Sequence, residues 1–158
     1  MAPRIDIAVE SAQWERVPQA QPAIVRAAAE VARTLILREG DEVGVTLTDD
    51  AAIAELNGRW RHKAKATNVL SFPSPPPPAP GAPRFLGDIV LAFETIEREA
   101  REEGKAFEAH LSHLTVHGLL HLLGFDHEED DDAEAMEALE TRILAGLGIA
   151  DPYGARAE

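Results

Sequence analysis

The 158-residue sequence contains no cysteine and no long unbroken apolar run. The missing cysteine excludes a disulfide framework and any thiolate zinc site, so a bound metal would have to take nitrogen and oxygen ligands. The first residues, MAPRIDIAVE, alternate polar and apolar side chains, and we expect neither a secretory signal nor a membrane span there. These absences favour a protein of the reducing cytoplasm with no membrane partner.

Acidic residues outnumber basic ones, and the formal net charge is -13 at pH 7. Such a charge argues against a nucleic-acid partner, because lysine and arginine drive phosphate binding. The charge is local, however. Eight acidic residues crowd into 128–140 without a basic one, whereas 56–84 holds five basic residues and no acidic one. The sequence therefore still allows a basic binding surface.

The length predicts one domain over 1–158 that is large enough to bury its own core. Period-two patterns predict strands at 4–9 and 43–47, with further short strands at 68–72 and 84–93. Helices are predicted between Pro22 and Gly40, at 51–57 with Asp49 or Asp50 as the cap, at 95–104 and at 106–124. A last amphipathic helix carries a core stripe of Met136, Leu139, Ile143 and Leu147.

A proline-rich run, SPPPPAPGAP, interrupts the chain between the last two predicted strands. A segment that lacks so many backbone donors is expected to form an exposed polyproline-like loop over 73–83. Most such runs are spacers, and docking to a proline-reading domain is the alternative.

Three histidines stand in the otherwise apolar stretch 117–127, HGLLHLLGFDH. His117 and His121 lie four residues apart, on one face of the predicted helix, where two ring nitrogens can reach one ion. Gly124 can end that helix in a left-handed turn, which would bring His127 beside the pair. Three histidines that leave a position open for water suit one Zn²⁺ per chain. His110 and His113 continue the stripe, with packing or support of the ligands as their expected role.

The same histidine spacing occurs in metzincin proteases. Those enzymes carry a glutamate directly after the first histidine as the general base, and this chain has Gly118 there. Peptide hydrolysis is therefore disfavoured.

A basic stretch, NGRWRHKAKATNVLSFP, precedes the proline run. Arg59, Arg61, Lys63 and Lys65 fall on alternate positions, so an extended chain would point all four to one side. Trp60 could stack on a base, and the stretch is a candidate for binding single-stranded nucleic acid. Arg61 is the preferred catalytic residue, because a guanidinium can grip a phosphate with two hydrogen bonds. Together with the metal site, this favours a metal-dependent phosphodiesterase.

The two motifs together resemble the YbeY family of bacterial endoribonucleases, also called ribosomal RNA maturation factors. The similarity runs from about residue 56 to 148 and includes LGDIVLA and the histidine motif. It implies an α+β domain with a four-stranded sheet packed against helices, and the metal site at the end of a central buried helix. It also implies that His117, His121 and His127 are the zinc ligands and that Arg61 is needed for activity.

By this resemblance the substrate is single-stranded RNA, and the cellular task is small-subunit ribosomal RNA maturation and ribosome quality control. Ribosomal proteins are the expected partners. The nucleophile stays open between a water and the ribose 2′-hydroxyl. A zinc-stabilised assembly factor without catalysis, which binds ribosomal RNA or a ribosomal protein, is the alternative function.

Overall fold

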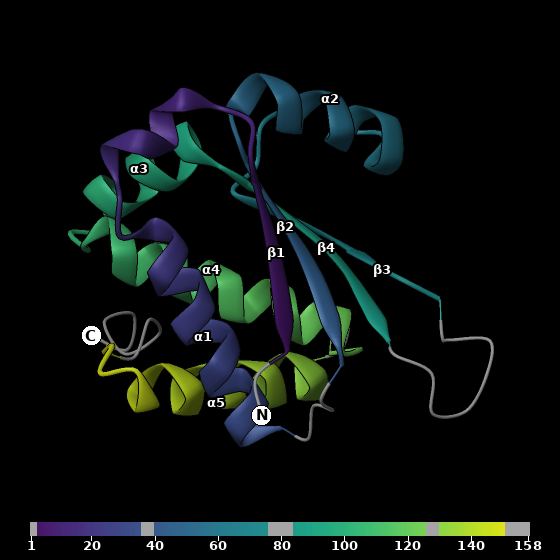
Figure 1. The fold of residues 1–158 in the computed structure, drawn as a ribbon, viewed down its shortest axis with the longest axis vertical. Helices are drawn as coiled ribbons and strands as arrows, with labels where there is room; N and C mark the ends of the chain where they lie inside the picture. The colour runs from purple at the N-terminus through teal and green to yellow at the C-terminus, as the bar shows by residue number, and fades with distance from the viewer. Residues whose placement is uncertain (1–2, 36–39, 76–83, 126–129, 151–158) are drawn as a thin grey trace.

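A computed structural model describes residues 3–35, 40–75, 84–125 and 130–150. Strands and helices alternate in the first part of the chain, where a short 3₁₀ helix follows the first strand. The last two strands are consecutive, and three helices follow them in the described residues (Figure 1). In chain order the elements are β1 (Arg4–Val9), η1 (Ala12–Arg16), α1 (Ala20–Thr34), β2 (Glu42–Thr48), α2 (Asp50–Arg61), β3 (Val69–Pro73), β4 (Phe85–Ala92), α3 (Phe93–Glu102), α4 (Phe107–Leu122) and α5 (Asp130–Gly146).

The four strands form one mixed sheet in the order β1-β2-β4-β3. β1 and β4 each pair parallel with β2, while β3 pairs antiparallel with β4. The period-two segments of the sequence are thus strands, and the predicted α+β fold with a four-stranded mixed sheet and five α-helices is confirmed.

Two apolar clusters cover the two faces of the sheet. The larger cluster joins the sheet to α1, α3, α4 and α5, and the smaller one lies under α2, which stands on the opposite side (Figure 1). Ile53 of α2 is fully buried against Leu70 and Val90 in the smaller cluster. The larger cluster takes Met136 and Ile143 from α5, with Leu139 and Leu147 partly buried against it. The stripe predicted for the last helix is therefore part of the core.

Helix α4 is the central helix of the fold. It contacts α1, α3, α5, β3 and β4, and ten of its sixteen residues are buried. Since a helix that is apolar on most sides must be covered on most sides, the Leu-rich sequence places α4 inside the molecule. The prediction of a central buried helix is confirmed.

The expectation of an extended basic stretch is wrong. Helix α2 continues through Arg61 and ends at His62, which adopts the left-handed conformation (φ 59°). Alternate positions point in different directions on a helix, so Arg59 and Arg61 do not form one stripe with Lys63 and Lys65. The predicted cap is confirmed, since the side chain of Asp49 accepts a hydrogen bond from the Ala52 amide (2.9 Å).

The proline-rich segment begins one residue later than expected, because Pro73 is the last residue of β3. Residues 76–83 lie outside the described part of the chain. On one side of this segment, the Ser74 amide donates to the Leu86 carbonyl (3.0 Å). On the other side, Arg84 forms a two-pronged ion pair with the buried Asp41, and its hydrogen bonds to Asp41 raise the pKa of Arg84.

In the described residues, no helix is both long and apolar enough to cross a membrane.

Candidate active site at the end of helix α4

His117 and His121 lie one turn apart on α4, and their rings meet nearly at right angles, with an interplanar angle of 78°. The two Nε2 atoms are 3.0 Å apart, and both residues line a cavity of about 410 Å³. Two nitrogens that each lie 2.0–2.1 Å from one tetrahedral Zn²⁺ would be about 3.3 Å apart. The pair therefore fits a single metal ion with little adjustment.

The opposite edge of the His117 ring is held by Glu140 of α5. Nδ1 of His117 donates to Oε1 of Glu140, and Nε2 of His113 bonds to the second oxygen (3.1 Å). Glu140 is fully buried. A carboxylate on one ring nitrogen fixes the tautomer that leaves the other nitrogen as a metal ligand. Glu140 is thus positioned to keep the proton on Nδ1 of His117 and to leave Nε2 with a lone pair that a cation could use.

The third predicted ligand, His127, lies outside the described residues. Among the residues that are described, no cluster of three metal-ligating side chains is present. The helix end that should direct the chain toward the pair is present as predicted. Gly124 adopts a left-handed φ of 100°, and the Phe125 amide closes the turn on the Leu120 carbonyl (3.0 Å), as in a Schellman motif.

Arg61 reaches the same cavity from the end of α2. Its Nη2 donates to the Ser71 carbonyl (2.8 Å), and its guanidinium lies 5.7 Å from the centre of the Phe72 ring. Ser71 Oγ in turn donates to the carbonyl of Gly118 (3.2 Å), and this hydrogen bond connects β3 to α4. The structure therefore brings three of the predicted catalytic residues, Arg61, His117 and His121, to one pocket.

Gly118 allows this close contact between α4 and the sheet. A Cβ atom there would lie 3.2 Å from two atoms of Ile89 and from Ser71 Oγ. Gly118 therefore serves the close packing of α4 against the sheet.

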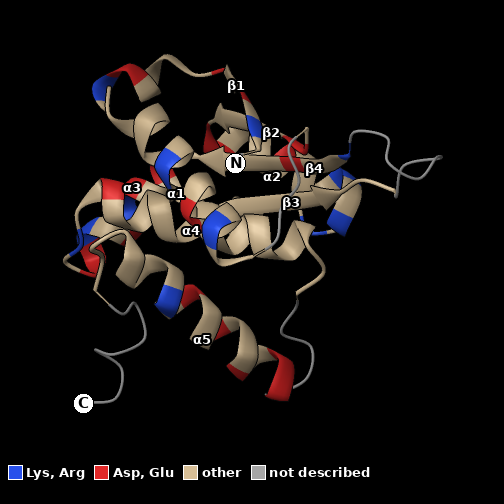
Figure 2. Cartoon of the chain, turned by 60° about the horizontal axis from the view of Figure 1, so that its bottom comes forward, with Lys and Arg blue, Asp and Glu red and all other residues tan. Residues whose placement is uncertain are grey.

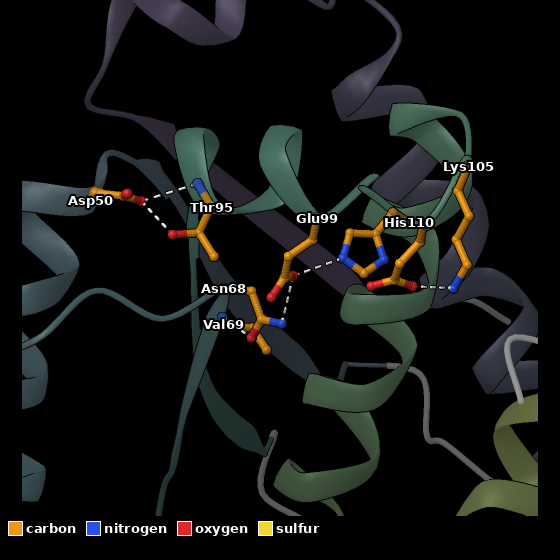
Figure 3. A network of polar contacts seen from close by, with 8 residues as sticks. Asp50, Asn68, Val69, Thr95, Glu99, Lys105 and His110 are labelled. Carbon is orange, nitrogen blue, oxygen red and sulfur yellow. Dashed lines mark hydrogen bonds and ion pairs between the residues drawn. The ribbon is translucent and has the colours of Figure 1, made fainter. Parts of the chain in front are cut away.

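His110, at the start of α4, has a different partner. Its Nε2 bonds to Glu99 Oε1 (2.9 Å), and the same oxygen accepts from the side chain of Asn68 (3.0 Å) (Figure 3). Asn68 lines the cavity that contains His117 and His121. This network connects the buried start of α4 with the wall of the pocket.

The remaining predicted RNA-contact residues divide into two groups. Arg59 forms a surface ion pair with Glu55 (3.0 Å), and Trp60 is 62% exposed. Lys63 and Lys65 line a second cavity next to the first, which Arg61 also lines.

Comparisons with known proteins identify the family. The family model described as Endoribonuclease YbeY matches residues 6–148. This chain belongs to the YbeY family. It is 54% identical to Endoribonuclease YbeY of Bradyrhizobium diazoefficiens, with 98% of this chain and 87% of that protein covered. It is also 51% identical to the Azorhizobium caulinodans protein of the same name, with 98% of both chains covered.

The YbeY fold also relates this chain to a solved structure. The solution structure of TM1509 from Thermotoga maritima aligns with a TM-score of 0.63 at 26% identity, covering 97% of this chain and 91% of that one. The resemblance inferred from the sequence motifs is thus confirmed at the level of the family and the fold.

Sequence reasoning missed two residues that this YbeY chain uses around the site, Glu140 and Glu99. Glu140 belongs to the acidic segment 128–140, where the residue pattern indicates only a local concentration of negative charge. The available signal was its position between Met136 and Ile143 on the apolar face of the last helix, where a carboxylate must be paired. Glu99 had no comparable signal, because its partners Asn68 and His110 are distant in sequence.

Proposed function

We propose that this member of an endoribonuclease family is a zinc-dependent enzyme that cuts single-stranded RNA during small-subunit ribosomal RNA maturation and ribosome quality control in the cytoplasm. The observation that carries the proposal is the convergence of His117 Nε2 and His121 Nε2, 3.0 Å apart, in a pocket that Arg61 also lines. Paired imidazoles beside a guanidinium suit phosphodiester chemistry.

His117, His121 and His127 are the proposed ligands of one Zn²⁺. When bound, zinc supplies a Lewis acid that polarises a phosphoryl oxygen and makes a water more acidic. The chain contributes the orientation: Glu140 holds the ring of His117, and the Gly124 turn sets the direction in which the chain leaves α4.

Arg61 is proposed to bind the scissile phosphate and to stabilise the negative charge that develops on it. Nη2 of Arg61 donates one hydrogen bond to the Ser71 carbonyl. The guanidinium has further N–H groups that can donate to phosphate oxygens. Because an arginine stays protonated throughout the physiological range, it acts here as a fixed charge and not as an acid.

Two nucleophiles are compatible with this site. Attack by the ribose 2′-hydroxyl would leave a 2′,3′-cyclic phosphate on one product and a 5′-hydroxyl on the other, whereas attack by water would leave a 5′-phosphate. Analysis of product ends by mass spectrometry separates the two reactions.

A non-catalytic assembly factor is the alternative function. The exposed acidic residues Asp131, Asp132 and Glu134 near the start of α5 (Figure 2) favour contact with a basic ribosomal protein. This surface is compatible with the nuclease as well, and we propose ribosomal proteins as partners in either case.

The decisive experiment compares labelled single-stranded RNA incubated with wild-type protein and with His121→Ala purified in the same way. We expect cleavage by the wild type and at least a hundredfold slower cleavage by the variant, since loss of a ligand weakens the metal site. Zinc content measured by elemental analysis should fall in parallel. If neither preparation cuts while both bind RNA, the assembly-factor function is favoured instead.

A further inference from the structure

A second cavity, of about 560 Å³, adjoins the metal-site cavity on the far side of Arg61. The two cavities share three lining residues, Arg61, Asn68 and Leu70. A single strand of RNA can therefore extend from one cavity into the other. The second cavity is built from the end of α2, the turn that follows it, and the exposed side of α3.

The walls of the second cavity are strongly basic in an otherwise acidic protein. Arg61, Lys63, Lys65 and Arg98 line it, with Glu99 as the carboxylate among its lining residues. Oε1 of Glu99 already accepts hydrogen bonds from Asn68 and His110 (Figure 3). A net positive cavity remains, and its natural ligand is an anion.

These four cations form no ion pair with a carboxylate in the described part of the chain, and Arg26 and Arg142 are the other two described cations that form none. Within the described ranges, seven arginines and lysines form ion pairs with acidic side chains: Arg4, Arg16, Arg33, Arg59, Arg84, Arg101 and Lys105. Four others that form none gather around this cavity. In a chain of net charge -13, carboxylates are plentiful, yet the described lining of this cavity includes one, Glu99, which bonds to Asn68 and His110 and not to the four cations.

The turn that carries the two lysines is fixed by its own contacts. The side chain of the buried Asn57 donates from Nδ2 to the Lys65 carbonyl (3.0 Å). The backbone carbonyl of Asn57 accepts a hydrogen bond from the Lys63 amide (3.2 Å). A Cβ atom on Gly58 would lie 3.1 Å from the Cβ of Ala64, so the turn packs closely on α2. The lysine side chains start from a preorganised backbone, which reduces the entropic cost of binding.

We propose that this second cavity binds a backbone phosphate of the same RNA strand, away from the phosphodiester that is cut at the metal site. This proposal rests on the proposed function. It adds a site that binds the RNA strand and lies apart from the site of cleavage. Arg98 and the two lysines hold the strand, and Arg61, which lines both cavities, connects the two positions. Contacts of this kind recognise phosphate and carry no base preference.

The test measures RNA affinity as a function of salt for wild type, Arg98→Gln and Arg142→Gln. Arg98 and Arg142 are both exposed helical arginines, and the described residues include no ion-pair partner for either. Each variant removes one positive charge, but Arg142 lies on α5, outside the cavity. Binding of labelled single-stranded RNA is followed by fluorescence anisotropy in chelator, so that no strand is cut.

We expect Arg98→Gln to reduce the steepness of the plot of log affinity against log salt by about 0.7, the contribution of one phosphate contact in a single strand. The double variant Lys65→Gln with Arg98→Gln should reduce it by about 1.4. Arg142→Gln should leave the slope unchanged. Equal slopes for Arg98→Gln and wild type, or an equal reduction in Arg142→Gln, would overturn the proposal.

Cleavage assays separate this proposal from the proposed function. With zinc present, Arg98→Gln should raise KM and leave kcat close to that of the wild type, because uniform binding is lost. A wild type that cuts RNA while Arg98→Gln binds normally refutes the phosphate cavity alone. A wild type that never cuts, with binding weakened in Arg98→Gln, refutes the proposed reaction and retains the cavity. Inorganic phosphate should compete with RNA more strongly in the wild type than in Arg98→Gln. Equal competition in the two proteins would show that phosphate binds outside this cavity and would count against the proposal.

Discussion

Glu140 is a buried carboxylate that holds two histidines of α4. It is fully buried and bonds to both His113 and His117. We predict that Glu140→Gln weakens zinc binding by about 10–100-fold, the usual effect of losing a carboxylate that orients a ligand histidine. Competition with a chromogenic chelator measures the affinity directly, without any assay of activity.

Glu137→Gln is the matched control for this variant. Glu137 lies one turn earlier on α5 and is not fully buried, so its replacement makes the same change in charge away from the histidines. The predicted role of Glu140 would be refuted by equal zinc affinities in the two variants, provided that circular dichroism shows both to be folded.

At the level of single residues, the sequence indicates candidate reactive side chains better than it indicates the residues that hold them in place. His117, His121 and Arg61, which line one pocket, were candidates in the sequence because their side chains are unusual in their local context and spacing. The side chains that hold them come from elsewhere: Glu140 is 23 residues from His117, and the Ser71 carbonyl is 10 residues from Arg61. Such pairings depend on tertiary packing, which no local pattern contains.

At the level of elements, the tightest junction lies where β4 meets β3 and the end of α4. Gly87 has φ 140°, and a Cβ atom there would lie 2.3 Å from the Phe72 carbonyl oxygen and 2.8 Å from Leu122 Cδ2. We predict that Gly87→Ala lowers the free energy of unfolding by at least about 2 kcal/mol, from overpacking combined with backbone strain. Urea denaturation followed by circular dichroism measures it.

Gly104→Ala is the comparison for this prediction. Gly104 also has a positive φ, 66°, but a Cβ atom there would meet nothing within 4 Å. Backbone strain alone should lower the free energy of unfolding by about 1–2 kcal/mol. A Gly87→Ala protein that is as stable as Gly104→Ala would show that β3 and α4 shift apart more easily than the geometry indicates.

The strands and most helices were predictable because their apolar residues repeat at the period of the element. The stretch 59–65 was not, because its alternating charges match a strand while its residues up to Arg61 continue α2. The buried Ile53 and Asn57, four residues apart on that helix, were the better guide. The 3₁₀ helix η1 carries the buried Trp14, and it is too short to show a period.

On the scale of the whole molecule, the order of strands could not be derived from residue patterns. β2 and β4 are neighbours although α2 and β3 lie between them in sequence. Period-two alternation identifies a strand and its buried face, but it does not specify the neighbour. The family resemblance supplied the four-stranded α+β fold.

The charge of the whole chain predicts opposite effects of salt on stability and on RNA binding. With a net charge of -13, the folded state repels itself, and added salt screens this repulsion. Between about 10 mM and about 150 mM NaCl we expect the Tm to rise by about 2–4 °C, equivalent to about 1 kcal/mol, while RNA affinity falls.

Scanning calorimetry and anisotropy on the same samples check both directions. A Tm that falls with salt would mean that attractive pairs such as Arg84 with Asp41 outweigh the general repulsion. RNA affinity that does not depend on salt would contradict a phosphate-bound complex altogether.

The anchored ends of the proline-rich segment offer a position for engineering. The chain is fixed at Ser74 by the Leu86 carbonyl and at Arg84 by Asp41, so a peptide tag inserted between 76 and 83 would start and finish at defined points on the sheet. Each doubling of a flexible connection costs only about 0.6 kcal/mol in closure entropy. A photo-cross-linker carried by such an insertion would map what lies next to the enzyme when RNA is bound, while both cavities keep their native sequence.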